Sequence, residues 1–118
     1  MTEPVLDLMR TAALGDPSTA AGRTALIEIF RVYFDNVAAA CAEMRQAAAS
    51  PDVVRKHAHR AKGASGVVGA VGLTTTFADL EAMAAAGETI PPAMFDDIDR
   101  QLTALRQAVS AQIGEDLQ

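Results

Sequence analysis

The residues most able to do chemistry stand together in the middle of the chain, where two histidines are surrounded by positive charge. The members of this group are Arg55, Lys56, His57, His59, Arg60 and Lys62. No acidic residue lies between Asp52 and Asp79, and four of the ten basic residues fall within eight positions. An imidazole can act as a nucleophile near neutral pH because much of it is unprotonated there. A phosphoryl group on such a ring would gain from a nearby lysine. The group is therefore either a solvated helix face or a local anion site.

The two histidines do not form a convincing metal site. On a helix His57 and His59 point to different faces, whereas chelating pairs stand three or four residues apart. No carboxylate or thiol nearby would complete a ligand set, so we predict no metal and place His57 at the edge of the core. The sequence also does not fit the glycine-rich phosphate-binding loops. In the Walker pattern the lysine follows the glycines, whereas Lys62 precedes them, and both the Walker and the Rossmann motifs need a strand before the loop.

Helical geometry separates the faces of this segment. At 100° per residue, the positions expected within about 60° of His59 are Arg55, Lys56, Lys62, Gly63, Gly66 and Ala70. Each glycine costs a helix interior roughly 1 kcal/mol relative to alanine. At Gly63 and Gly66 the missing side chains would let another protein approach His59. Gly69 and Gly72 turn away from His59, so helix packing or termination explains them better. Ser65 is expected to point away from the site, and two interpretations stay open for it: a functional role, or a cap or hydrogen bond within the helix.

The stretch from His59 to Ser65, HRAKGAS, followed by Gly69, Ala70 and Leu73, resembles the H-x-L-K-G-x-S-x-x-x-G-A signature of histidine-containing phosphotransfer (HPt) domains. The order of segments is similar to that family over essentially the whole chain. One departure is Ala61, where the family usually has a bulkier apolar residue.

The resemblance implies a phosphocarrier of a multistep two-component phosphorelay rather than an enzyme. His59 would accept a phosphoryl group from the aspartyl phosphate of a response-regulator receiver domain and pass it to another regulator. Lys62 would stabilise that group and Gly63 would permit docking. The surrounding Arg55, Lys56 and Arg60 would suit the acidic pocket of the receiver, with Gly66 and Ala70 completing the docking surface.

Partners implied by the resemblance are receiver domains and a histidine kinase, including hybrid kinases. Mg²⁺ and most of the catalytic machinery would belong to the receiver, so no cofactor is expected on this chain. Two alternatives stay open. One is a helical adaptor or inhibitor that binds a kinase or receiver without being phosphorylated. The other is the histidine-bearing domain of a chemotaxis-type kinase.

Length and composition indicate the domain number, the fold class and the kinds of partner. The 118 residues predict one domain, 1–118, and half of them are hydrophobic, which is enough for a core. Alanine-rich sequence without strand alternation favours an all-α fold. A net charge of −5 opposes a nucleic-acid binder. We expect no signal peptide, because the first residues, MTEPVLDLMR, contain no apolar h-region, and no apolar tract is long enough to span a bilayer. We therefore expect a cytoplasmic protein, and a monomer because the chain could close a four-helix core alone. Cys41 is expected to be a buried thiol.

The hydrophobic spacing predicts an antiparallel up-and-down four-helix bundle preceded by a short helix. The short helix is expected at residues 3–14 and a long one at 21–49. The apolar stripe of the long helix recurs at three- and four-residue steps: Leu26, Phe30, Tyr33, Val37, Cys41 and Met44. The run Ser50-Pro51-Asp52 should start the next helix, which continues into the glycines. A fourth helix is expected to be capped at Thr74–Thr76 and closed by Gly87, with Phe77, Leu80 and Ala84 on its inner side. The last should follow Pro91-Pro92 with one apolar stripe: Phe95, Ile98, Leu102, Leu105, Val109 and Ile113.

Overall fold

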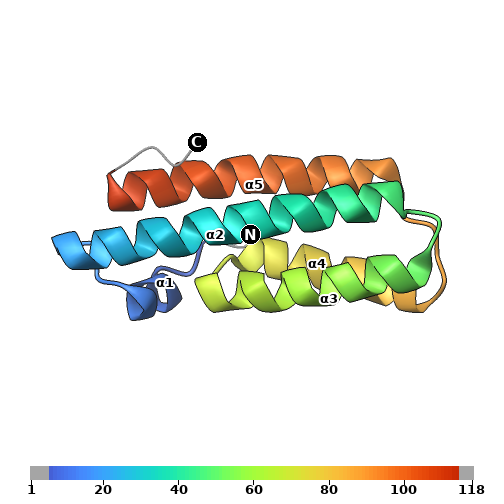
Figure 1. Ribbon diagram of the computed structural model, residues 1–118, viewed down its shortest axis with the longest axis horizontal. Helices are drawn as coiled ribbons and strands as arrows, with labels where there is room; N and C mark the ends of the chain where they lie inside the picture. Colours follow the sequence, from blue (N-terminus) through green and yellow to red (C-terminus); the bar gives the residue numbers. More distant parts are fainter. Residues whose placement is uncertain (1–5, 115–118) are drawn as a thin grey trace, which may run out of the picture.

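The protein is all-helical, as predicted. The structure, a computed structural model, describes residues 6–114, which contain five α-helices and no strand (Figure 1). The helices are α1 (Leu8–Leu14), α2 (Ala20–Gln46), α3 (Pro51–Val68), α4 (Val71–Ala85) and α5 (Pro92–Ile113). None of the helices in this described part is long and apolar enough to cross a membrane.

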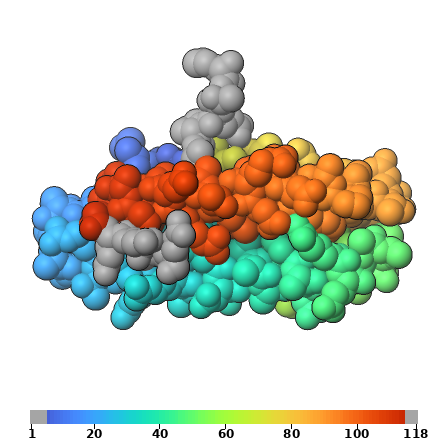
Figure 2. Space-filling view, turned by 90° about the horizontal axis from the view of Figure 1, so that it is seen from above, coloured from blue at the N-terminus to red at the C-terminus, as the bar shows by residue number. Residues whose placement is uncertain are grey.

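The four long helices form a closed ring of neighbours. Helix α2 packs against α3, α3 against α4, α4 against α5, and α5 returns to α2, while α1 lies against α2 and α3. From above, α5 runs alongside α2 over most of the length of α2 (Figure 2). Helices α3 and α5 do not contact each other, so they occupy one diagonal of the bundle. Short connections between successive helices give the up-and-down arrangement.

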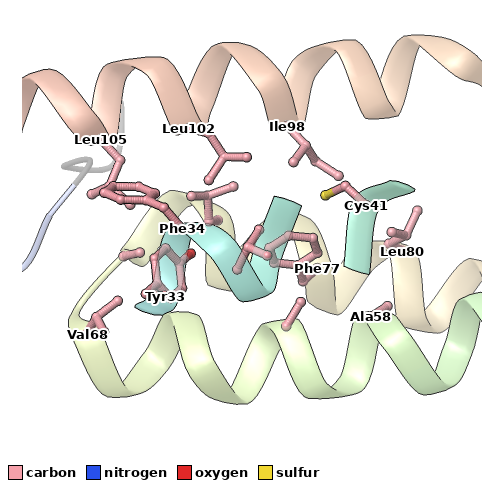
Figure 3. Packing of buried hydrophobic residues seen from close by; sticks show 14 of the residues in the cluster. Tyr33, Phe34, Cys41, Ala58, Val68, Phe77, Leu80, Ile98, Leu102 and Leu105 are labelled. Carbon is pink, nitrogen blue, oxygen red and sulfur yellow. The ribbon is translucent and has the colours of Figure 1, made fainter. Parts of the chain in front are cut away.

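The core is built from the predicted stripes. On α2 every predicted stripe residue is buried, namely Leu26, Phe30, Tyr33, Val37, Cys41 and Met44. On α5 the same is true of all six predicted positions. Side chains from four helices meet in this interior (Figure 3). Removing one large apolar side chain from water stabilises the fold by about 1.5–3 kcal/mol, and these stripes supply many such side chains.

Helix α3 begins where the sequence predicts and ends in its glycine run. Ser50 occupies the N-cap position with Pro51 next, although the serine side chain makes no capping hydrogen bond. At the other end Gly69 adopts φ +80°, a left-handed conformation that stops the helix. This confirms the expectation that Gly69 terminates the helix.

Helix α1 caps the end of α3 with hydrogen bonds. The Asp7 amide donates to the Gly69 carbonyl at 2.7 Å, and Thr11 Oγ1 donates to the Val68 carbonyl at 3.1 Å. These contacts satisfy carbonyls that have no partner within α3. The predicted short helix is therefore present, but it begins at Leu8 with Asp7 as its N-cap. Residues 3–5 of the predicted range lie outside the described residues.

The predicted start of α4 is wrong. The helix begins at Val71 with Ala70 as its N-cap, directly after the turn at Gly69. Thr74 and Thr76 lie inside the helix, and their hydroxyls donate to the carbonyls of Ala70 and Gly72, four residues back. Threonine hydroxyls can hydrogen-bond to the backbone inside a helix as well as at its cap. The three threonines alone therefore did not determine where the helix begins.

Other boundaries differ by a few residues. Helix α2 ends at Gln46 rather than residue 49. Helix α4 ends at Ala85 with Ala86 as its C-cap, directly before Gly87, which adopts φ +74° and follows the helix end as predicted. Gly72 is explained by packing, as expected, because a Cβ there would lie 3.0 Å from Gln101 Oε1 on α5.

Candidate functional site

His59 stands in the middle of α3 with its ring largely in solvent. Its side chain is 67% exposed, and its Nδ1 atom lies 2.7 Å from Glu81 Oε2 on α4. The helix turns on both sides of His59 fix its backbone. The imidazole is therefore accessible, and one of its nitrogens is engaged by a neighbouring helix.

Lys62 follows one helical turn later and meets the same carboxylate. Its Nζ donates to Glu81 Oε1 at 2.6 Å. The Glu81 side chain is only 19% exposed, and its hydrogen bonds to Lys62 and then to His59 lower the pKa of its carboxyl. Glu81 is thus a carboxylate at neutral pH, with each oxygen bound to a different residue of α3.

The contact with Glu81 determines which ring nitrogen can react. A carboxylate only accepts hydrogen bonds, so Nδ1 of His59 carries the hydrogen that it donates to Glu81. In the neutral ring Nε2 is then unprotonated and keeps its lone pair. A neutral imidazole held in one tautomer on a rigid helix, with an ammonium group one turn away, is equipped for nucleophilic chemistry at Nε2.

The two glycines expected beside His59 have different surroundings. A Cβ at Gly63 would meet nothing within 4 Å, so the surface there is open. At Gly66 the backbone carbonyl accepts a hydrogen bond from Arg10 Nη1 at 2.8 Å, and a Cβ would lie 3.8 Å from that atom. Open approach is therefore a property of Gly63, whereas α1 partly overlies Gly66.

Three of the basic residues predicted to lie on the docking surface are exposed and have no carboxylate as an ion-pair partner in the described part of the chain. Arg55, Lys56 and Arg60 lie on the surface of α3, and within residues 6–114 none of them makes an ion pair or side-chain hydrogen bond. Lys62 differs, because Glu81 pairs with it. Within the described residues, the positive charges of Arg55, Lys56 and Arg60 on α3 are therefore not paired with a carboxylate.

Ala70 does not belong to this surface. It is fully buried and forms the N-cap of α4. The helical projection placed it near His59 only because that projection continued α3 past Gly69, where the helix ends.

Ser65 also differs from its prediction. Its side chain is fully buried and its hydroxyl lies 2.7 Å from the Tyr33 hydroxyl on α2. It therefore joins two helices rather than capping or bonding within its own. Burial raises the pKa of Tyr33 to about 12, although the Ser65 hydrogen bond opposes this shift.

His57 lies apart from His59, as expected. It is partly buried and lines a groove of about 320 Å³ between α2 and α3, together with Arg60, Glu43 and Ala64. Across the described part of the chain, no group of three His, Cys, Asp or Glu side chains is arranged to hold a metal ion.

Glu81 is the site residue that the sequence reasoning missed. Its neighbour Leu80 was assigned to the inner side of the fourth helix, and Glu81 stands at the edge of that side. The sequence contains one usable signal: an acidic residue on the helix that follows the basic cluster, at a distance from the turn similar to that of His59.

A family model described as Hpt domain matches residues 28–108, which cover most of α2, all of α3 and α4, and most of α5. No curated protein and no solved structure matches the chain. Hpt domains are phosphocarrier modules of two-component phosphorelays, where they interact with receiver domains and kinases. The matched region holds His59, Lys62 and Glu81, and the five helices have the arrangement expected of the family. This chain belongs to the Hpt domain family.

Proposed function

We propose that His59 is the phospho-accepting residue of this Hpt domain. The observation that carries the proposal is the exposed imidazole whose Nδ1 is engaged by Glu81, beside Lys62 and the open surface at Gly63. This arrangement leaves Nε2 as the nucleophile. Neither an adaptor nor an inhibitor would need a nucleophilic ring nitrogen at this position.

The transfer step follows from that geometry. The Nε2 lone pair attacks the phosphorus of an aspartyl phosphate on a receiver domain, and an N–P bond forms. The P–O bond to the aspartate breaks, and the carboxylate leaves with the electron pair. The Nδ1 proton stays on the ring, hydrogen-bonded to Glu81. In the onward step the N–P bond breaks, the imidazole leaves, and the aspartate of a second receiver forms the new P–O bond.

The partner would complete the site in this proposal. The receiver would bring Mg²⁺ and the acidic pocket that holds its aspartate, and the unpaired Arg55, Lys56 and Arg60 would attract that pocket. Lys62 would neutralise part of the phosphoryl charge during transfer. We further propose that the protein acts as a cytoplasmic monomer, in a relay that a histidine kinase, including a hybrid kinase, supplies with phosphoryl groups.

The test is phosphoryl transfer from a panel of purified receiver domains that have been phosphorylated with acetyl phosphate. Label should move to the wild-type chain in an acid-labile, base-stable form. His59→Gln should abolish the label, and His57→Gln, the matched control on the same helix, should keep it. If His59→Gln and wild type behave alike, His59 is not the acceptor. If the wild type binds receivers without becoming labelled, the adaptor alternative replaces this proposal.

A further inference from the structure

The Glu81 carboxylate accepts hydrogen bonds from two residues of the site, His59 and Lys62, which have different proposed roles. Glu81 Oε2 accepts from His59 Nδ1 at 2.7 Å, while Glu81 Oε1 accepts from Lys62 Nζ at 2.6 Å. The first contact sets the tautomer of the ring. The second contact directs the lysine charge toward α4. The resting protein therefore already uses the ammonium group that a phosphoryl group on His59 would need.

The position of the incoming group makes this a competition. Nδ1 is engaged by Glu81, so a phosphoryl group would be attached at Nε2, across the ring from the carboxylate. Lys62 follows one turn after His59 and is about one third exposed, so its flexible side chain can reach toward either anion. The Glu81 carboxylate and the phosphoryl group would then both attract the Lys62 ammonium group. The more strongly Lys62 binds Glu81, the less it stabilises the phosphoryl group.

We propose that Glu81 competes with the phosphoryl group for Lys62 and thereby limits how strongly Lys62 stabilises phosphorylated His59. This inference rests on the proposed function of His59 as acceptor. Glu81 is then a positioning residue that acts through Lys62. Its effect is to shorten the lifetime of the phosphohistidine, which favours handing the group on over storing it.

The chain offers a substitution that separates the two contacts of Glu81. In Glu81→Gln the side-chain amide oxygen can still accept from His59 Nδ1, but the neutral amide does not hold the Lys62 ammonium electrostatically. A control by ¹⁵N NMR of the His59 ring should show the same tautomer in wild type and in Glu81→Gln. Glu81→Ala should lose both contacts and change the tautomer populations.

The decisive measurement is a double-mutant cycle on the half-life of phosphohistidine. Phosphoramidate is the donor, so no receiver is needed: Nε2 of His59 forms the N–P bond as the P–N bond of the donor breaks and ammonia leaves. Four proteins are compared at pH 8, namely wild type, Lys62→Met, Glu81→Gln and the double variant. Two unit charges a few ångströms apart in water change an equilibrium by roughly fivefold. Lys62→Met should therefore shorten the half-life by a factor several times larger in the Glu81→Gln background than in wild type.

The outcomes are separable. Equal factors in the two backgrounds would overturn the competition, even if receivers transfer normally to His59. A larger factor in the Glu81→Gln background would support it, even if a particular receiver panel contains no partner. If phosphoramidate labels His59→Gln as well as wild type, His59 is not the acceptor, and both proposals fall. As a second readout, the ¹³C shift of the Glu81 carboxyl should change more on phosphorylation of wild type than on phosphorylation of Lys62→Met, in which only the contact with His59 can transmit the change.

Discussion

Substitutions at Gly63 should raise the stability of the fold and lower the rate of phosphoryl transfer from a receiver. A Cβ at this position would meet nothing within 4 Å, so a side chain there causes no clash within the described part of the chain. Glycine costs a helix interior roughly 1 kcal/mol relative to alanine. Gly63→Ala and Gly63→Leu should therefore raise the free energy of unfolding by about 1 kcal/mol, which for a domain of this size is a Tm increase of a few degrees.

Transfer from a receiver should change in the other direction. The side chain added at Gly63 would project beside His59, where the partner's aspartate must approach. A displacement of the reacting groups by about 1 Å can cost on the order of 100-fold in rate, so Gly63→Leu should lose about that much and Gly63→Ala less. Labelling by phosphoramidate should be nearly unchanged, because a small donor still reaches Nε2.

The assay combines thermal unfolding by circular dichroism with the rate of transfer from a phosphorylated receiver. Ala111→Leu is the matched control, because it adds apolar bulk to an exposed position on α5, which does not contact α3. That variant should transfer normally. Normal transfer by Gly63→Leu would refute the access argument, and a lower Tm would refute the open space beside Gly63.

Three further predictions concern the turn that ends α3 and two buried side chains of α2. Gly69→Ala should destabilise the fold by about 1–2 kcal/mol in urea unfolding, because φ is +80° and the new Cβ would lie 2.9 Å from the Asp7 carbonyl oxygen; unchanged stability would contradict the capping role. Tyr33→Phe should cost about 1–3 kcal/mol by leaving the buried Ser65 hydroxyl unpaired, and Tyr33→Phe combined with Ser65→Ala should recover part of that loss. Burial raises the pKa of the Cys41 thiol to about 11, so at pH 8 the thiol is uncharged and should react with a thiol reagent only as fast as the fold opens. Labelling as fast as a free thiol would show that Cys41 is accessible.

The helices could be predicted because their signals are local. The apolar spacing of α2 and α5 determines which faces are buried, and each predicted stripe residue is in the core. The start of α3 was predicted from the proline at its first position. Fold class and the exposed side of α3 follow from such patterns without knowledge of which helices are neighbours.

Predictions failed where the outcome depended on contacts between helices. The pairing of Ser65 with Tyr33 joins residues from α3 and α2, and helical geometry alone gives no sign of it. Gly66 looked like a cleared position, but Arg10 from α1 donates to its carbonyl. The sequence predicted the exposed face of α3 while leaving out the neighbours that partly cover it.

The missed glutamate follows from the misplaced turn. Helices α3 and α4 form a hairpin that turns at Gly69 and Ala70, and residues at equal distances from such a turn lie opposite each other. Glu81 follows the turn at about the distance by which His59 precedes it, so the two side chains meet. A turn placed at Thr74–Thr76 would lie about five residues later in the chain. Because the facing residue moves by twice that amount, the position opposite His59 would shift by about ten residues, or roughly three helical turns, far beyond Glu81. The left-handed conformation of Gly69 thus does more than end a helix, because it sets the register that brings the carboxylate of Glu81 to His59 and Lys62.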